Sequence, residues 1–133
     1  MESFEKSLVN LGTEYLDLYL IHMPYGDYHG SWRAMEGVLK AGRVKAIGVC
    51  NFLPDRLLDL ILSHEIIPAV NQIELHPFCQ QKELRHLMAQ YQIQSMAWAP
   101  FAEGQNGIFQ NPELTAIGQN YGKTPAQVIL RWW

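Results

Sequence analysis

The sequence predicts an α/β fold in which parallel strands alternate with helices. Short apolar stretches that suit strands alternate with helix-like stretches along most of the chain. No two-residue hairpin turn joins any pair of these strands, which favours helical crossovers between parallel neighbours. The strands are also apolar on both faces, as parallel strands are when helices cover both sides of the sheet.

Four strands are expected, each separated from the next by a helix. Their sequences are YLDLYLIH (15–22), VKAIGVCNF (44–52), AVNQIELH (69–76) and QSMAWAP (94–100). The first strand finishes on His22 and is stopped by Met23 and Pro24, which leaves a histidine at the mouth of a buried strand. Such a histidine is either a hydrogen-bonded structural residue or a functional group, and this stretch alone does not decide between them.

The helix boundaries follow from glycines and from N-cap residues. The first helix runs to about Asn10 before Gly12, and others are expected at 31–42, 55–64, 82–91, 112–122 and 124–133. Asn111 before Pro112 and Thr124 before Pro125 each place an N-cap residue ahead of a first-turn proline. The last part of the chain is therefore predicted to form two helices.

Composition and charge indicate which class of binding partner the protein has. The 133 residues have the length of one ordinary domain, and 48% hydrophobic with 17% charged residues is typical of a globular protein. The formal net charge is -3 at pH 7, with acidic and basic residues interspersed. Nucleic acids and anionic membranes need clustered positive charge, so neither is expected as a partner. A small-molecule partner is predicted instead.

The two cysteines and the N-terminus carry no special signal. Cys50 and Cys79 lack CxxC spacing and have no run of other ligands beside them, so neither a disulfide framework nor a metal site is expected. The N-terminal stretch has no apolar signal-peptide region, and no window has the length and apolarity of a membrane span. A cytoplasmic location is predicted.

Polar or aromatic residues stand at or near the carboxyl end of every predicted strand. They are His22; Cys50 and Asn51; Asn71, Gln72, Glu74 and His76; and Trp98. The strand-to-helix joints lack the glycine-rich turn that an open dinucleotide-binding sheet uses to bind pyrophosphate. In a closed (β/α)8 barrel the strand ends converge on one mouth, where active sites of that fold lie. Each residue taken singly is more often structural, but together they favour a shared site.

The chain resembles the aldo-keto reductase family. The motifs that carry the resemblance are YLDLYLIHMP, AGRVKAIGVCNF, PAVNQIELHP, AWAPFAEGQNGIF and YGKTPAQVILRW, and they span the whole sequence. The AWAPFAEG stretch is similar to small bacterial members of the diketogluconate-reductase type. The resemblance implies a partial (β/α)8 TIM barrel, about strands four to seven with their helices. It also implies reduction of aldehydes and ketones with NADPH, with NADH as the alternative cofactor.

The resemblance assigns roles to the residues at the strand ends. His22 matches the active-site histidine that donates a hydrogen bond to the substrate carbonyl. Cys50, Asn51 and Gln72 match residues that bind the nicotinamide carboxamide, with Cys50 standing where serine is commoner. Trp98 matches the aromatic residue that stacks against the nicotinamide ring. Met23, Pro24 and Tyr25 resemble the first substrate loop.

The departures from the family pattern are as informative as the matches. The family's catalytic Asp, Tyr and Lys belong to segments that would precede residue 1, and no tyrosine here stands in the catalytic motif. The whole of residues 1–133 is therefore expected to be one segment of the barrel that lacks the N-terminal strands and the eighth strand. The chain alone is predicted to be inactive, and to self-associate through open sheet edges at 15–21 and 94–99.

Two further readings compete with a reductase segment. One is a truncated, non-catalytic half-barrel that binds a ligand or assembles with another chain. The other is half of an isomerase or aldolase barrel, which would need a lysine or paired carboxylates at the strand ends. Glu74 is the only carboxylate at those ends and no lysine stands there, so the last reading is disfavoured.

Overall fold

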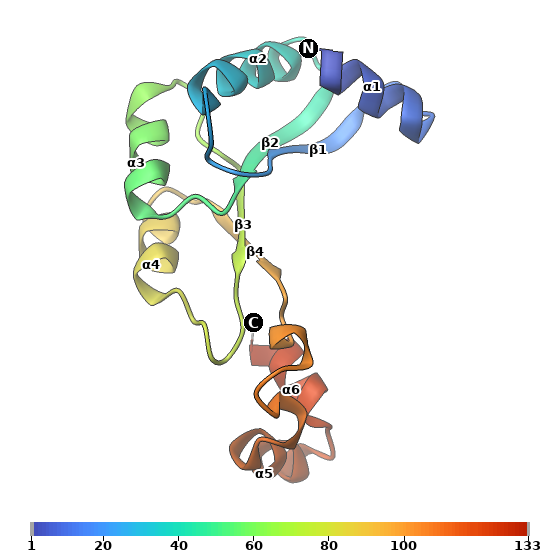
Figure 1. The fold of residues 1–133 in the computed structure, drawn as a ribbon, viewed down its shortest axis with the longest axis vertical. Coiled ribbons are helices and arrows are strands. Elements are labelled where there is room, and N and C mark those ends of the chain that lie inside the picture. The colour runs from blue at the N-terminus through green and yellow to red at the C-terminus, as the bar shows by residue number, and fades with distance from the viewer. Residues whose placement is uncertain (1, 133) are drawn as a thin grey trace. The chain divides into compact units, whose positions relative to one another are not determined.

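The structure is a computed structural model that describes residues 2–132, and Figure 1 shows its elements. Residues 1 and 133, at the ends of the first and last predicted helices, lie outside this range. The helices are α1 (Glu2–Leu11), α2 (Tyr28–Lys40), α3 (Pro54–Ser63), α4 (Lys82–Gln90), α5 (Pro112–Tyr121) and α6 (Pro125–Trp132). The strands are β1 (Leu16–Ile21), β2 (Val44–Cys50), β3 (Val70–Glu74) and β4 (Gln94–Trp98), and the 3₁₀ helices η1 (Ala102–Gly104) and η2 (Ile108–Gln110) follow.

The four strands form one sheet in the order β1-β2-β3-β4. β1 pairs with β2 in parallel, with Ile21 opposite Val49. β2 pairs with β3 in parallel, with Cys50 opposite Gln72. A helix lies in the chain between each strand and the next, so the predicted α/β fold with helical crossovers is confirmed.

Helix α2 begins earlier than predicted, at Tyr28 rather than at residue 31. The cause is Asp27, whose side chain accepts a hydrogen bond of 2.7 Å from the backbone N–H of Gly30 and so caps the helix. Sequence reasoning placed the start of this helix at residue 31 and overlooked this cap. The 3₁₀ helices η1 and η2 were also missed, because such short elements leave no periodic pattern.

The two C-terminal helices form as the proline signatures predicted. The side chain of Asn111 accepts hydrogen bonds from the N–H groups of Glu113 and Leu114, at 3.0 and 3.1 Å. Helix α5 ends at Tyr121 and is capped by Gly122, whose φ of 61° lies in the left-handed region that suits glycine. Across residues 2–132, no helix combines the length and the apolar character that crossing a bilayer requires.

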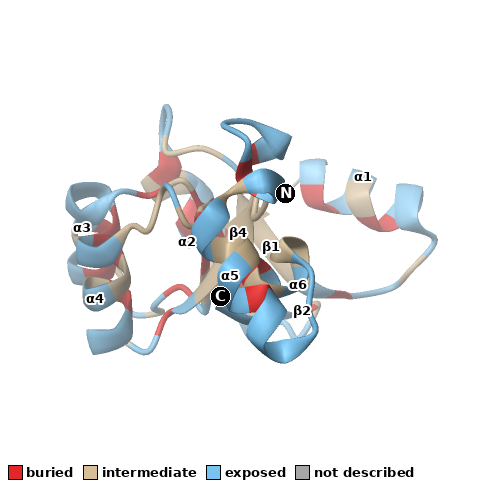
Figure 2. Cartoon of the chain, turned by 90° about the horizontal axis from the view of Figure 1, so that it is seen from below, coloured by how far each residue is buried: buried red, intermediate tan, exposed pale blue. Residues whose placement is uncertain are grey.

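The chain divides into two compact units, and each has its own core. The first unit comprises Met1–Gln72 and Glu83–Ser95. Its largest fully buried side chains include Trp32 of α2, Phe52 after β2, and Leu57 and Leu60 of α3. The buried residues of α1 and α3 lie on one side of each helix, and the remaining sides are exposed (Figure 2).

The second unit comprises Ile73–Lys82 and Met96–Trp133. It contains the end of β3, the end of β4, both 3₁₀ helices, α5 and α6. Its buried cluster consists of Ala102, Ile108 and Ile129, with Phe101 and Leu114 packed against them. The polar strand ends that the sequence singled out are therefore distributed over both units.

Candidate active site

The carboxyl ends of β1 and β2 are held together by one side chain, that of Asn51. Because Ile21 pairs with Val49, the residues that follow the two strands lie next to each other. Asn51 Nδ2 donates a hydrogen bond of 3.2 Å to the backbone carbonyl oxygen of His22, and it also lies 3.2 Å from the sulfur of Met23. Three residues predicted to form the site are thus brought together.

Asn51 occupies a backbone conformation that few other residues tolerate. Its φ is 61°, in the left-handed region, where asparagine is enriched over other non-glycine residues. This turn directs its N–H to the carbonyl oxygen of Gln72, at 2.9 Å. The end of β2 is therefore fastened both to the end of β1 and to the middle of β3.

Cys50, the last residue of β2, lies opposite Gln72, in the middle of β3. The Cys50 thiol donates a weak hydrogen bond of 3.8 Å to Gln72 Oε1. Burial raises the pKa of Cys50, so the group is a neutral thiol at neutral pH and can act as a hydrogen-bond donor. The three residues predicted to bind the nicotinamide amide, Cys50, Asn51 and Gln72, are neighbours in this unit.

A surface pocket of about 310 Å³ opens beside Asn51. Its lining residues are Met23, Pro24, Tyr25, Asn51, Leu53, Asp55 and Arg56. The three predicted substrate-loop residues therefore line the same pocket as a predicted cofactor residue. His22 is exposed at the strand end and does not belong to the lining. The sequence argument missed Leu53, Asp55 and Arg56, which only the fold of the loop after β2 brings to the pocket.

Asn71 stabilises the fold and does not line the pocket beside Asn51. Its side chain is fully buried, and Nδ2 donates a 2.8 Å hydrogen bond to the carbonyl oxygen of Phe52. Its Oδ1 atom has no hydrogen-bond partner among the described residues. The residue ties β3 to the segment after β2, which explains a polar side chain at this point of the strand.

In the second unit, Trp98 is the last residue of β4, as its predicted role requires. The ring is half-buried, and the Trp98 carbonyl oxygen accepts a hydrogen bond of 3.3 Å from the N–H of Leu75. This contact joins the ends of β3 and β4. Trp98 therefore stands at a strand end, and its role in ring stacking stays a prediction.

The second unit also groups Glu74, His76 and Cys79, whose potential metal-binding atoms lie within 4.8 Å of one another. Sequence reasoning noted the first two residues and missed Cys79, which a short antiparallel bridge with His76 brings back to them. His76 Nδ1 accepts a hydrogen bond from the Phe78 N–H, so Nε2 carries the ring proton and donates it to Glu74 across 3.0 Å. With its proton on Nε2, the ring is not prepared to bind a metal there.

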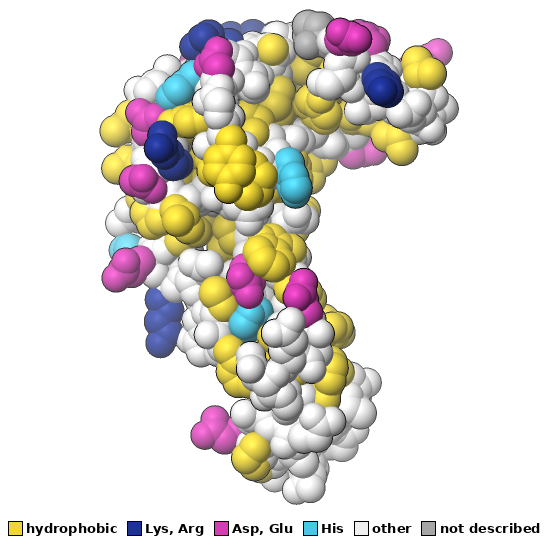
Figure 3. All heavy atoms as spheres, viewed as in Figure 1, with side chains coloured by type: hydrophobic (Ala, Val, Ile, Leu, Met, Phe, Trp, Pro, Cys, Tyr) yellow, Lys and Arg dark blue, Asp and Glu magenta, His cyan; other side chains and the backbone are white. Residues whose placement is uncertain are grey.

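The charged side chains do not gather into one patch on the face that Figure 3 shows. Lysine and arginine side chains lie singly there, several of them close to acidic ones. Ion pairs of this kind join Lys45 to Asp17 at 2.7 Å and Lys40 to Glu65 at 3.0 Å.

Comparison with known proteins identifies relatives for the whole chain. A model of the Aldo/keto reductase family matches residues 1–133. Glyoxal reductase of Bacillus subtilis (strain 168) is 48% identical over 133 residues, which cover 99% of this chain and 48% of that protein. Methylglyoxal reductase DkgA of Salmonella typhimurium is 42% identical over 134 residues, which cover 98% of this chain and 49% of that protein.

A solved structure has a fold similar to that of this chain. An aldo-keto reductase of Bombyx mori in complex with NADP matches with a TM-score of 0.91 at 33% identity, covering 98% of this chain and 48% of that one. The four parallel strands thus match part of the (β/α)8 barrel of such proteins. The chain spans about half the length of the curated relatives it matches.

Proposed function

The chain belongs to the aldo/keto reductase family, and on this premise we propose that it supplies part of the active site of an NADPH-dependent carbonyl reductase. The observation that carries the proposal is the junction at Asn51. One side chain holds the ends of β1 and β2 together and lines a pocket with Met23, Pro24 and Tyr25. Residues 1–133 are proposed to form one segment of the (β/α)8 barrel of that enzyme.

His22 is proposed to be the catalytic residue of this segment. A neutral imidazole at the exposed end of β1 can donate a hydrogen bond to a carbonyl oxygen, on which negative charge develops during reduction. The carbonyl of His22 is already bound by Asn51, so its backbone position is defined before a substrate arrives. Met23, Pro24 and Tyr25 are proposed to contact the rest of the substrate.

The side chains present fit the amide of a nicotinamide cofactor. A carboxamide has both a donor and an acceptor, and Asn51 and Gln72 each offer both, while the neutral Cys50 thiol donates to Gln72 Oε1 and helps to orient that amide. NADPH, with NADH as the alternative, would be held by these residues and by Trp98, and when bound it supplies the hydride. The NADP in a related Bombyx mori structure supports this choice of cofactor.

Small dicarbonyl compounds are the proposed substrate class. Two relatives with more than 40% identity are named glyoxal reductase and methylglyoxal reductase, which supports a compact carbonyl substrate. The pocket beside Asn51 has a volume of about 310 Å³, which suits a small molecule rather than a macromolecule. A cytoplasmic location remains a prediction from the sequence.

The isolated chain is proposed to be inactive, because no residue in it matches the family's proton donor. Two of its tyrosines already have hydrogen-bond partners within the fold. The Tyr28 hydroxyl donates a 2.7 Å hydrogen bond to Asp59, and the Tyr19 hydroxyl lies 3.2 Å from Ser3 Oγ. This observation also keeps a second candidate open, a non-catalytic half-barrel that binds a ligand or another chain.

A chimaera separates the two candidates. Residues 2–132 would replace the matching half of Bacillus subtilis glyoxal reductase, and turnover of glyoxal would be followed by loss of NADPH absorbance. We expect activity from the chimaera and none from the isolated chain, because a positioned proton donor typically contributes about 10²- to 10⁴-fold. A chimaera that folds by circular dichroism but reduces no carbonyl would favour the non-catalytic half-barrel. Turnover by the isolated chain would refute its proposed inactivity.

A further inference from the structure

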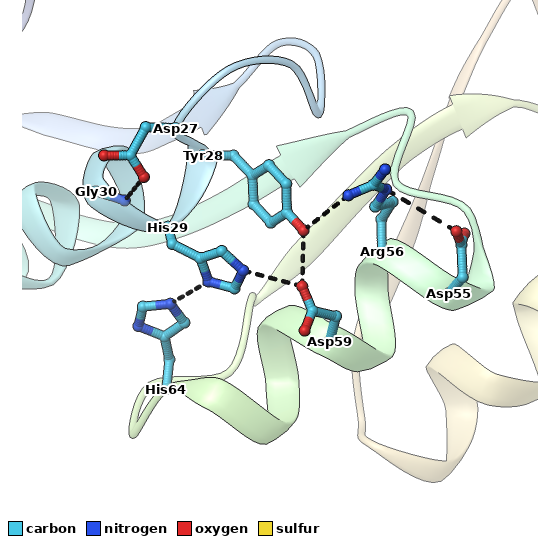
Figure 4. A network of polar contacts seen from close by, with 8 residues as sticks. All are labelled: Asp27, Tyr28, His29, Gly30, Asp55, Arg56, Asp59 and His64. Atoms are coloured by element: carbon cyan, nitrogen blue, oxygen red, sulfur yellow. Dashed lines mark hydrogen bonds and ion pairs between the residues drawn. The ribbon is translucent and has the colours of Figure 1, made fainter.

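Two histidines in the first unit face each other with their ring nitrogens in contact (Figure 4). His29 is near the start of α2, and His64 directly follows α3. His29 Nδ1 lies 2.9 Å from His64 Nε2, and the two ring planes are inclined by only 19°, with centroids 5.1 Å apart. Nothing in the proposed reductase function uses this pair.

The outer nitrogen of His29 is bound to a carboxylate. His29 Nε2 lies 2.9 Å from Asp59 Oδ2, and the Tyr28 hydroxyl donates to the same oxygen at 2.7 Å (Figure 4). An ionised carboxylate only accepts hydrogen bonds, so Nε2 of His29 carries a proton.

The outer nitrogen of His64 also faces a carboxylate. His64 Nδ1 lies 3.7 Å from Glu36 Oε2, and the side chains are only 5% and 13% exposed. The second oxygen of Glu36 accepts a 3.2 Å hydrogen bond from the N–H of Ile66, which holds the carboxylate in place. Both ends of the pair are therefore closed by acidic groups, Asp59 on one side and Glu36 on the other.

Two neutral rings leave one unfavourable contact in either tautomer. If His64 Nε2 donates its proton to His29, then His64 Nδ1 has only a lone pair, and it points at the Glu36 carboxylate. If the proton lies on His64 Nδ1, the inner nitrogens face each other with a lone pair on each. A cation between the inner nitrogens removes the conflict, because both outer nitrogens then carry protons that point at carboxylates.

We propose that His29 Nδ1 and His64 Nε2 bind one divalent transition-metal ion of the zinc type, with water completing its coordination. A histidine that binds a metal usually donates its other N–H to a carboxylate or carbonyl. Asp59 takes that position at His29, and Glu36 lies 3.7 Å from the outer nitrogen of His64. Imidazole suits zinc, copper and nickel, whereas magnesium and calcium prefer oxygen ligands. Binding moves the single proton of His64 from Nε2 to Nδ1 and releases none from a neutral pair.

The observed spacing is close to what a shared ion needs. With Zn–N bonds of about 2.0–2.1 Å and tetrahedral geometry, two ligand nitrogens lie about 3.3 Å apart. The inner nitrogens are 2.9 Å apart, so the rings must separate by a few tenths of an ångström. His29 is 30% exposed at its side chain, which leaves the ion a path from solvent. The ion would link the start of α2 to the end of α3.

The positive charge of Arg56 does not face the proposed metal position (Figure 4). Arg56 NH1 contacts the Tyr28 hydroxyl at 3.3 Å, and Asp55 lies 3.9 Å from the same guanidinium. Tyr28 therefore stands between Arg56 and the histidine pair. The Glu74, His76 and Cys79 group offers more donors, but its histidine proton already lies on the nitrogen that faces Glu74. The histidine pair is the better prepared site of the two.

The test is isothermal titration of the metal-stripped chain with zinc chloride at neutral pH. We expect one saturable site per chain, with affinity reduced at least tenfold in His29→Gln and in His64→Gln. Asp59→Asn, at an exposed position, should weaken binding about 10- to 100-fold, because it removes the partner that orients the ligand. His86→Gln, at an exposed histidine of α4, is the matched control and should bind like the wild type. Cys79→Ser should also bind like the wild type.

A second measurement needs no variant. In NMR spectra of the wild-type chain, zinc should shift the ring signals of His29 and His64 and leave those of His76 and His86 in place. An absence of saturable zinc binding would mean that only a proton lies between the rings, and the proposal would be wrong. It would also be wrong if binding survived both histidine substitutions in folded variants, or disappeared in Cys79→Ser.

Discussion

Asn51 Nδ2 donates a hydrogen bond to the backbone carbonyl oxygen of His22 across 3.2 Å, and so joins the residues that follow β1 and β2. The contact is made to the backbone of His22 and leaves its imidazole at the exposed strand end. A side chain proposed to bind the cofactor therefore also positions the residue proposed to bind the substrate carbonyl.

Replacing His22 should impair catalysis more than folding. In the glyoxal reductase chimaera, His22→Ala should lower kcat/KM about 10- to 1000-fold, the range expected when one donor to a developing oxyanion is removed. His86→Ala, at an exposed histidine of α4, is the control and should leave turnover unchanged. If His22→Ala left turnover of every carbonyl intact, His22 would be a structural residue.

Replacing Trp98 should weaken the binding of NADPH rather than slow the chemical step. In the same chimaera, Trp98→Ala should raise the Kd for NADPH by about tenfold or more, because aromatic stacking contributes about 0.5–1.5 kcal/mol beyond the buried area. Trp98→Tyr keeps an aromatic face and should bind NADPH nearly as well. Fluorescence titration with NADPH measures both, and equal affinity in the alanine and tyrosine variants would contradict the stacking role.

Gly48 allows β2 and β3 to approach each other closely. A Cβ atom at Gly48 would lie 2.5 Å from the Val70 carbonyl oxygen and 2.9 Å from Cδ2 of Leu20. Gly48→Ala should therefore lower the free energy of unfolding by about 1–3 kcal/mol, as overpacking does. Gly37→Ala on the exposed face of α2 meets nothing within 4 Å and should instead stabilise the chain by about 0.5–1 kcal/mol. Urea unfolding compares the two, and equal stabilities would disprove the close approach.

The two cysteines should differ in reactivity. Burial raises the pKa of Cys50, and burial with the nearby Glu74 carboxylate raises that of Cys79. A raised pKa favours the protonated thiol in the folded state, so this stability is present below the ordinary thiol pKa and is lost as pH rises above it. With iodoacetamide at neutral pH, mass spectrometry should find slow labelling at half-exposed Cys79 and labelling of Cys50 only after unfolding. Fast labelling of Cys50 in the folded chain would contradict its burial.

The isolated chain should self-associate. The strand order leaves β1 and β4 at the two edges of the described sheet, and neither strand contains a lysine or proline to deter pairing. Sedimentation velocity at micromolar concentration should show dimers or larger species. Ser95→Lys places a charge on edge strand β4 and should reduce association, whereas Ser63→Lys at the end of α3 is the matched control. A monodisperse monomer with protected edge-strand amides would refute the prediction.

The pattern of apolar and polar residues, together with caps and turn residues, was sufficient to predict the strands, the crossovers and the helices after Asn111 and Thr124. These features depend on local periodicity, caps and turn residues, which neighbouring residues determine. The resemblance assigned His22, Cys50, Asn51, Gln72 and Trp98 to one site. In the structure, Cys50 and Trp98 end β2 and β4, His22 and Asn51 directly follow β1 and β2, and Gln72 lies within β3. Sequence reasoning missed the Asp27 cap and placed the start of that helix at residue 31.

The alternation of strands and helices, and the kinds of residue near the strand ends, follow from the sequence alone. Which side chains meet across long stretches of chain depends on the tertiary structure. Asn51 reaches His22 because parallel register sets the ends of β1 and β2 side by side. His29 meets His64 because α2 and α3 pack in one unit, and no spacing in the sequence encodes that contact. Such contacts depend on how elements pack, and packing involves residues that are distant in the chain.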